Sequence, residues 1–417
     1  MKSLHKYQIL GFAAFLFLPL GFYVHKAMAP MTAVIVVFVV VQELFFKRSL
    51  KFISWKFYMV ALTIPLLGAA SFYWSITPSE SLKLAPVIGV TILGGILLVN
   101  NSNLETVAER SHFDAWIIAG GIIGFSFVFI ENISDAALSR NLLEIFGLNK
   151  ANRYVKAREY NSGVSIAALF IWPFALAVSR RFALRLSIPI IAFGLIGIFL
   201  GDTTAPSLAL VVGFLAFIFY GVIRQKGSKF LIGLVCAYTV IAPILPNLLP
   251  DPRSSDSFLT KYYSSSDFHR YIIWTSTVDH IVEKPILGSG LDSTRALYSS
   301  DKMRRYDAVI KSTGKKIGFT AEPIPLHPHN AILQIWLELG AVGAALLAFF
   351  LACLLHFIGK STRNIWESAL IIGLFFTGLT IASLSYGVWQ SWWLGSLILA
   401  SSMMVAAIKL SPKQSPH

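Results

Sequence analysis

The most restrictive feature of this sequence is a series of apolar runs, each long enough to cross a lipid bilayer. A membrane-spanning helix needs about 20 predominantly apolar residues, and lipid cannot satisfy exposed backbone groups, so each run is expected to form a helix. The twelve runs cover residues 8–24, 30–46, 57–74, 85–100, 114–131, 162–179, 187–201, 207–223, 230–247, 329–357, 366–385 and 388–408. They predict an all-α polytopic membrane protein with about 12 transmembrane helices.

The composition agrees with a chain that lies mostly in lipid. Hydrophobic residues make up 55% of the 417 residues and charged residues 13%, whereas a soluble domain carries about 25% charged residues. Cys236 and Cys353 both lie inside apolar runs, which indicates neither a disulfide framework nor a metal cluster. A cleavable signal peptide is not expected, because a second apolar run follows the first almost at once.

Basic residues orient the chain in the membrane. Cytoplasmic connections of membrane proteins carry an excess of Lys and Arg. The short connections 47–56, 180–186, 224–229 and 358–365 are basic, whereas Lys26 is the only Lys or Arg in the connections of the opposite side, 25–29, 202–206 and 386–387. We therefore expect both termini in the cytoplasm.

This orientation divides the chain into three parts. Residues 1–247 are predicted to form transmembrane helices 1–9, with an outward loop at about 132–161. Residues 248–328 form a large, partly helical outward loop. Residues 329–417 form transmembrane helices 10–12 and a cytoplasmic tail.

One segment of the large loop has the spacing of an amphipathic helix. Apolar residues recur at helical intervals over residues 267–284, and the pattern ends at the proline and glycines of 285–290. Such a helix, with Tyr271 and Trp274 on its apolar side, would lie along the membrane surface. A second, short helix is predicted at about 301–311.

Arginines in the outward loops are candidate ligands of an anion. Arg270 lies one turn before Trp274, so its guanidinium could stack on the indole while it points into a cleft. The alternative is an arginine that snorkels at the interface. The first outward loop also contributes Arg153 and Arg158, although most charges in both loops are typical of a solvated surface.

His329 lies where the large loop meets the tenth apolar run, and we predict that it is a catalytic base. Pro325 and Pro328 precede it, and proline is favoured at the start of a helix. The positive end of the helix dipole would keep the imidazole neutral, while the free N–H groups of the first turn suit an anion. A base beside an anion site fits group transfer from a lipid-linked phosphate donor. The alternatives are a polar anchor at the interface, or a catalytic role for His327, His269 or His280.

Residues further along the same run frame this prediction. Gly340 and Gly343 follow His329 by eleven and fourteen residues, which places both on its side of a continuous helix, where they would let a neighbouring helix approach closely. Glu338 would lie about 180° from His329 and should have a partner of its own. No HExxH motif, Cys-x-x-Cys pair, phosphate-binding loop or dinucleotide motif occurs, so neither a metal nor a cofactor is predicted.

Together these residues resemble a known family. His329-Asn330, followed after nine residues by Gly340-x-x-Gly343, resembles the H-[NSQ]-x9-G-x-x-G pattern of bacterial O-antigen ligases. Arg270-x-x-x-Trp274 and the segment 285–290 are similar to the signature of the wider ligase and polymerase superfamily. The twelve runs with a large loop before the third-last run also match, and the segment after Arg158 matches more loosely.

The resemblance implies a glycosyltransferase of the inner membrane, similar in fold to C-type glycosyltransferases, that acts at the periplasmic face without metal or nucleotide sugar. It would transfer O-antigen from undecaprenyl pyrophosphate to a sugar hydroxyl of lipid A–core, with inversion at the anomeric carbon. His329 would be the general base, Arg270 and Arg158 would bind the pyrophosphate, and Asn330 would orient the imidazole or a sugar. Membrane lipids are the other expected partners, and nucleic acid is not one.

One departure and several alternatives accompany this resemblance. Many relatives carry an arginine where Ala205 and Pro206 stand here, so Arg153, Arg158 or Arg270 would have to hold the phosphates. The nearest alternatives are an O-antigen polymerase and a protein O-oligosaccharyltransferase. A transporter or flippase would instead show half-repeats and midplane charges. A structural membrane scaffold is the remaining alternative.

Overall fold

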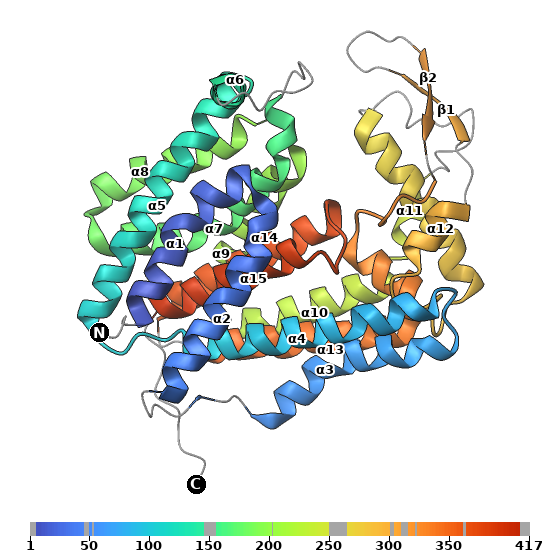
Figure 1. Ribbon diagram of the computed structural model, residues 1–417, viewed down its shortest axis with the longest axis horizontal. Helices are drawn as coiled ribbons and strands as arrows, with labels where there is room; N and C mark the ends of the chain where they lie inside the picture. Colours follow the sequence, from blue (N-terminus) through green and yellow to red (C-terminus); the bar gives the residue numbers. More distant parts are fainter. Residues whose placement is uncertain are drawn as a thin grey trace.

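Long helices that pack side by side make up most of the molecule (Figure 1). The computed structural model describes residues 6–45, 50–51, 54–145, 156–201, 203–249, 265–300, 304–309, 316–321, 323–361 and 364–408. The helices are α1 Lys6–Tyr23, α2 Met28–Phe45, α3 Trp55–Ala70, α4 Pro78–Asn101, α5 Val107–Ile133, α6 Ala137–Ile145, α7 Asn161–Arg181, α8 Leu184–Phe199, α9 Thr204–Ile223, α10 Gln225–Ile241, α11 Ser265–Glu283, α12 Thr294–Ser300, α13 Ala331–Ser361, α14 Ile365–Leu384 and α15 Ser391–Ala407. Short 3-10 turns are η1 His25–Ala27, η2 Ser71–Tyr73, η3 Ala157–Tyr160 and η4 Leu245–Leu248.

The helices confirm a multi-pass membrane protein. Within the described ranges, nine helical segments are long and apolar enough to span a bilayer; they contain α1, α2, α3, α4, α5, α7, α9, α13 and α14. Two further apolar helices, α8 and α15, are shorter, with 16 and 17 residues. Together with α10, they coincide with the other three predicted runs. For these three runs, spanning the membrane stays a prediction.

The helices form two groups joined through a middle layer. The first group is α1, α5, α7 and α8, and the second is α3, α4, α10 and α13, which lie side by side in the lower part of Figure 1. Helices α2, α9, α14 and α15 connect the groups. Because lipid is as apolar as the side chains, close backbone approach replaces a hydrophobic driving force between helices. At Gly120 of α5, for example, a Cβ atom would lie 2.4 Å from the carbonyl oxygen of Phe15 in α1.

Arg180, at the end of α7, ties several helix ends together on one side of the molecule. Its guanidinium lies 2.8 Å from a carboxylate oxygen of Glu367 at the start of α14 and 3.8 Å from one of Asp114 near the start of α5. It also bonds to the carbonyl of Ala407 at the end of α15. The basic connection 180–186 therefore lies at one end of α7 and α14, and the start of α7 and the end of α14 lie at the other. This arrangement is expected when successive runs cross the membrane in alternating directions.

The large loop differs from its prediction in two respects. Helix α11 is present as predicted, but its apolar face packs against α13 and η4 rather than lying on a membrane surface. Instead of a helix at about 301–311, the described residues there form strand β1 (Arg304–Val309), which pairs antiparallel with β2 (Lys316–Ala321). This hairpin is the one sheet in the described residues and adds to an otherwise helical fold. A strand depends on a distant partner, which helical spacing within a short window does not reveal.

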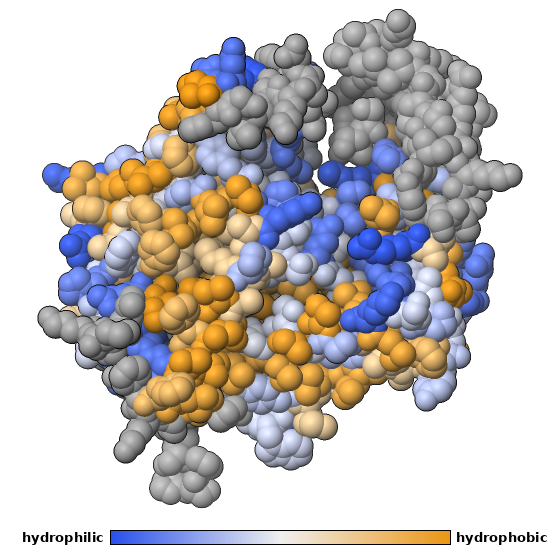
Figure 2. Space-filling view, viewed as in Figure 1, coloured by the Kyte–Doolittle hydropathy of each residue, from blue (hydrophilic) through white to orange (hydrophobic). Residues whose placement is uncertain are grey.

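The surface pattern agrees with a membrane protein. In Figure 2, hydrophobic side chains cover much of the visible face, while hydrophilic side chains gather toward the side that carries α11 in Figure 1.

Candidate active site

His329 lies just before α13 rather than within its first turn. Its backbone has φ +53°, a left-handed conformation that cannot continue into a helix. Asn330 follows and caps the helix, because its Oδ1 accepts hydrogen bonds from the N–H groups of Ile332 (3.0 Å) and Leu333 (3.1 Å). The predicted helix position of His329 is therefore wrong by two residues. The Asn330 amide oxygen serves the helix, not the imidazole.

The His329 ring is fixed by one short hydrogen bond. Its Nδ1 lies 2.6 Å from the carbonyl oxygen of Ser385, the residue that follows α14. Because a carbonyl only accepts, Nδ1 must carry the proton. In the neutral ring Nε2 then keeps its lone pair and can accept a proton.

The surroundings keep this imidazole neutral. Burial lowers the pKa of His329 below 6.5; the bond to Ser385 opposes this, while the charges of Arg270 and His269 lower it further. The ring of His327 contacts that of His329 with 4.4 Å between centroids, and burial lowers the pKa of His327 to about 4. The prediction of a neutral base is supported, although the main cause is burial rather than the helix dipole.

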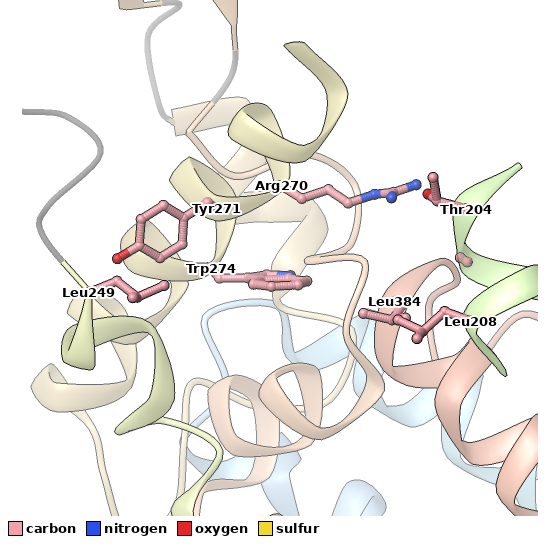
Figure 3. A pocket seen from close by; sticks show the side chains of 8 residues that line it. Thr204, Leu208, Leu249, Arg270, Tyr271, Trp274 and Leu384 are labelled. Carbon is pink, nitrogen blue, oxygen red and sulfur yellow. The ribbon is translucent and has the colours of Figure 1, made fainter. Parts of the chain in front are cut away.

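Arg270 and Trp274 of α11 lie beside this residue. The indole Nε1 of Trp274 donates a hydrogen bond of 3.0 Å to the carbonyl oxygen of Pro328, the residue before His329. Both side chains line a cavity of about 270 Å³ together with Thr204, Ala205, Leu208, Leu249, Tyr271 and Leu384. Figure 3 shows Arg270 extending from α11 toward Thr204 at the start of α9. Stacking of the guanidinium on the indole stays a prediction.

The cavity and His329 belong to one site. Leu384 lines the cavity, and the next residue, Ser385, holds the imidazole. The charge of Arg270 acts on both His329 and the buried Tyr386. The Tyr386 hydroxyl lies 2.9 Å from Oγ of Ser165, which brings the start of α7 to the same place. The site thus unites a neutral base, a cation and an apolar cavity.

Gly340 breaks α13, so the glycines do not extend a helical face from His329. Gly340 has φ +62°, and a Cβ atom there would lie 2.3 Å from the carbonyl oxygen of Ile286. It thus permits close approach of the segment 285–290, not of another helix. At Gly343 a Cβ atom would meet Leu339 of the same helix at 2.3 Å. The predicted role of both glycines in helix packing is therefore corrected.

The segment 285–290 satisfies the backbone groups that the break leaves unpaired. In a regular helix the carbonyls of residues 337 and 338 would accept from the N–H groups of residues 341 and 342. Here those carbonyls accept from Ser289 (2.9 Å) and Gly290 (2.8 Å). The two N–H groups donate to the carbonyls of Pro285 (2.8 Å) and Ile286 (3.2 Å). The segment 285–290 and the break at Gly340, which are far apart in the sequence, are thus joined by four backbone hydrogen bonds. We call this arrangement the joint.

Other predicted residues lie partly outside the description. Arg153 is outside the described residues. The backbone of Arg158 belongs to η3, immediately before α7, but its side chain is not among the described ones. Sequence reasoning missed the role of residues 385–390; it singled out only the connection 386–387, for its lack of Lys and Arg.

Comparisons with known proteins found similarity to ligases. Residues 189–348 match the family model described as O-antigen ligase, a range that includes Arg270, His329 and Gly340. Two provisionally named polysaccharide ligases, from Rickettsia bellii (strain RML369-C) and Rickettsia typhi (strain ATCC VR-144 / Wilmington), are each 28% identical. Both matches cover 87% of this chain, and they cover 84% and 80% of the relatives. A third such protein, from Rickettsia prowazekii (strain Madrid E), is 29% identical. That match covers 74% of this chain and 71% of the length of the relative.

Over these residues the chain is similar to O-antigen ligases, and over most of its length it is similar to proteins named as polysaccharide ligases. The names of these relatives describe enzymes that act on a polysaccharide. In this chain, Ala205 lines the same cavity as Arg270. Ala205 is one of the two positions where many members of the resembled family carry an arginine. That position therefore adjoins Arg270.

Proposed function

We propose that the protein is an O-antigen ligase of the bacterial inner membrane. It transfers polysaccharide from undecaprenyl pyrophosphate to a sugar hydroxyl of lipid A–core at the periplasmic face. The observation that carries the proposal is the His329 ring, whose Nδ1 is held by Ser385 while Nε2 is left as a base beside the Arg270 cavity. The family match supports the substrate class.

The proposed reaction is a single displacement. Nε2 of His329 takes the proton of the acceptor hydroxyl as its oxygen attacks the anomeric carbon of the donor sugar. The bond from that carbon to the pyrophosphate oxygen breaks, and its electron pair leaves with undecaprenyl pyrophosphate. Attack opposite the leaving group inverts the anomeric configuration. The Ser385 carbonyl, hydrogen-bonded to Nδ1, favours the imidazolium that forms.

Arg270 has the second role, stabilisation of the leaving group. Its planar guanidinium can donate two parallel hydrogen bonds to phosphate oxygens, which a point charge cannot. Hydrogen-bond donors that are held in place before the reaction stabilise the charge that develops on the pyrophosphate leaving group. Arg158 and Arg153, from the first outward loop, are the other proposed phosphate ligands.

Reconstitution with two acceptors tests the proposal. The purified protein is placed in liposomes with undecaprenyl pyrophosphate-linked polysaccharide and either lipid A–core or a second lipid-linked chain. We expect polysaccharide on lipid A–core. Elongation of the second chain would identify a polymerase, product on an added acceptor protein would identify a protein O-oligosaccharyltransferase, and translocation without a new glycosidic bond would identify a flippase.

A further inference from the structure

Glu338 is a fully buried carboxylate surrounded by hydrogen-bond donors. It lies on α13, with 0% of its surface exposed. Its Oε1 accepts from the Thr294 hydroxyl (2.7 Å) and the Gln334 amide (2.9 Å). Its Oε2 accepts from the Trp389 indole (2.7 Å) and the Asp292 backbone N–H (3.0 Å). Four donors on two oxygens suit an ionised carboxylate, which only accepts.

These bonds fix the connection 385–390 against α13. Trp389 belongs to that connection, between α14 and α15. Gln334 adds a second tie, because its amide oxygen accepts from the backbone N–H of Val388 at 2.9 Å. The connection begins at Ser385, which holds His329, and ends at Gln390, whose amide nitrogen lies 3.1 Å from Nε2 of His327.

Glu338 itself is remote from the reacting atoms. It lies seven positions after Ala331 in α13, which corresponds to about 10 Å along the helix. Its oxygens are occupied by protein donors, and its side chain has no exposed surface. The hydrogen-bonded route from Glu338 to the imidazole runs through the connection 385–390.

We propose that Glu338 is a positioning residue for the base. It anchors the connection 385–390 so that the Ser385 carbonyl keeps the proton of His329 on Nδ1 and leaves Nε2 for the acceptor hydroxyl. This inference rests on the proposed function of His329. Gln334 and Trp389 are the two side chains through which Glu338 acts.

Glu338→Gln tests the inference with almost no change in shape. An amide cannot accept all four bonds, because its NH2 group must face one of the donors. The connection should relax and the bond to Ser385 should weaken. We expect kcat to fall about 10- to 100-fold, as when groups that orient a catalytic ligand are removed, while KM for the donor stays near its wild-type value.

The pH profile separates positioning from a general loss of structure. The described titratable and charged groups that act on His329 are His327 from its own segment and His269 and Arg270 from α11; Tyr386 lies beside its partner Ser385. None of these is altered by Glu338→Gln. Because the bond to Ser385 raises the pKa of His329, its loss should move the acidic limb of kcat to lower pH. An unchanged or raised apparent pKa would overturn the inference.

Three further variants keep the test decisive. Trp389→Phe removes one of the four hydrogen bonds to Glu338. It should also move the acidic limb of kcat to lower pH, with a smaller loss of kcat. This variant keeps the test open if Glu338→Gln fails to fold. Glu43→Gln is the matched control. Glu43 is another buried glutamate, on α2, and its carboxylate lies 3.2 Å from Nζ of Lys6. This variant should leave the pH profile unchanged. If His329→Ala abolishes transfer while Glu338→Gln and Trp389→Phe keep the wild-type profile, this inference fails and the proposed function stands. If His329→Ala keeps full activity, the proposed function itself fails.

Discussion

At the scale of single residues, the state of His329 determines how transfer depends on pH. The folded protein lowers the pKa of this imidazole below 6.5, chiefly by burial. The neutral, proton-accepting form therefore predominates at neutral pH, and protonation removes it only on the acidic side. We expect kcat/KM to be level near pH 7 and to fall in acid with an apparent pKa below 6.5, as measured by initial rates across pH. An acidic limb above pH 6.5 would contradict this.

Arg270 can be tested by a change that preserves its charge. Arg270→Lys keeps one positive charge beside the cavity but removes the planar fork of donors. We expect transfer to fall by about 10-fold or more, the equivalent of losing one hydrogen bond to a charged group. The measurement is kcat/KM for the lipid-linked donor in liposomes. Equal activity of the lysine variant would show that paired recognition of phosphate is wrong.

At the scale of elements, the break in α13 depends on Gly340. Gly340→Ala would force a side chain into φ +62°, which costs about 1–3 kcal/mol before the contact with Ile286 is counted. We expect a clear fall in the thermal unfolding temperature in detergent. Gly233→Ala, on α10, is the control: its Cβ atom would meet nothing within 4 Å, and alanine should stabilise that helix slightly. Equal unfolding temperatures for the two variants would contradict the proposed joint.

The sequence predicts some of these elements and not others. Apolar runs locate the long helices because burial in lipid needs a continuous apolar segment, and helical spacing locates α11. The β1–β2 hairpin was missed because each strand depends on the other. Within the site, His329 and Arg270 were predicted from residue type and motif. The Ser385 carbonyl could not be, because every residue has one and only the fold brings this one to the imidazole.

At the scale of the whole molecule, the site lies opposite the basic connections. Arg180, at the end of α7, contacts the start of α5, the start of α14 and the end of α15. His329 binds the carbonyl oxygen of Ser385, at the other end of α14. With Cys236 and Cys353 replaced by alanine, a cysteine at Leu326, which is 52% exposed, should react with a membrane-impermeant maleimide added from the periplasm. A cysteine at the exposed Arg185 should react only after the membrane is opened. The reverse pattern would contradict the proposed orientation.

The central claim is that His329 is the base for transfer to the acceptor hydroxyl, and the most direct measurement is the rate of His329→Ala. The variant should insert and unfold like the wild type but transfer polysaccharide to lipid A–core at least about 100-fold more slowly, the contribution typical of a general base. His280→Ala, near the end of α11, is the matched control and should keep the wild-type rate. Wild-type transfer by a correctly folded His329→Ala protein would contradict the account.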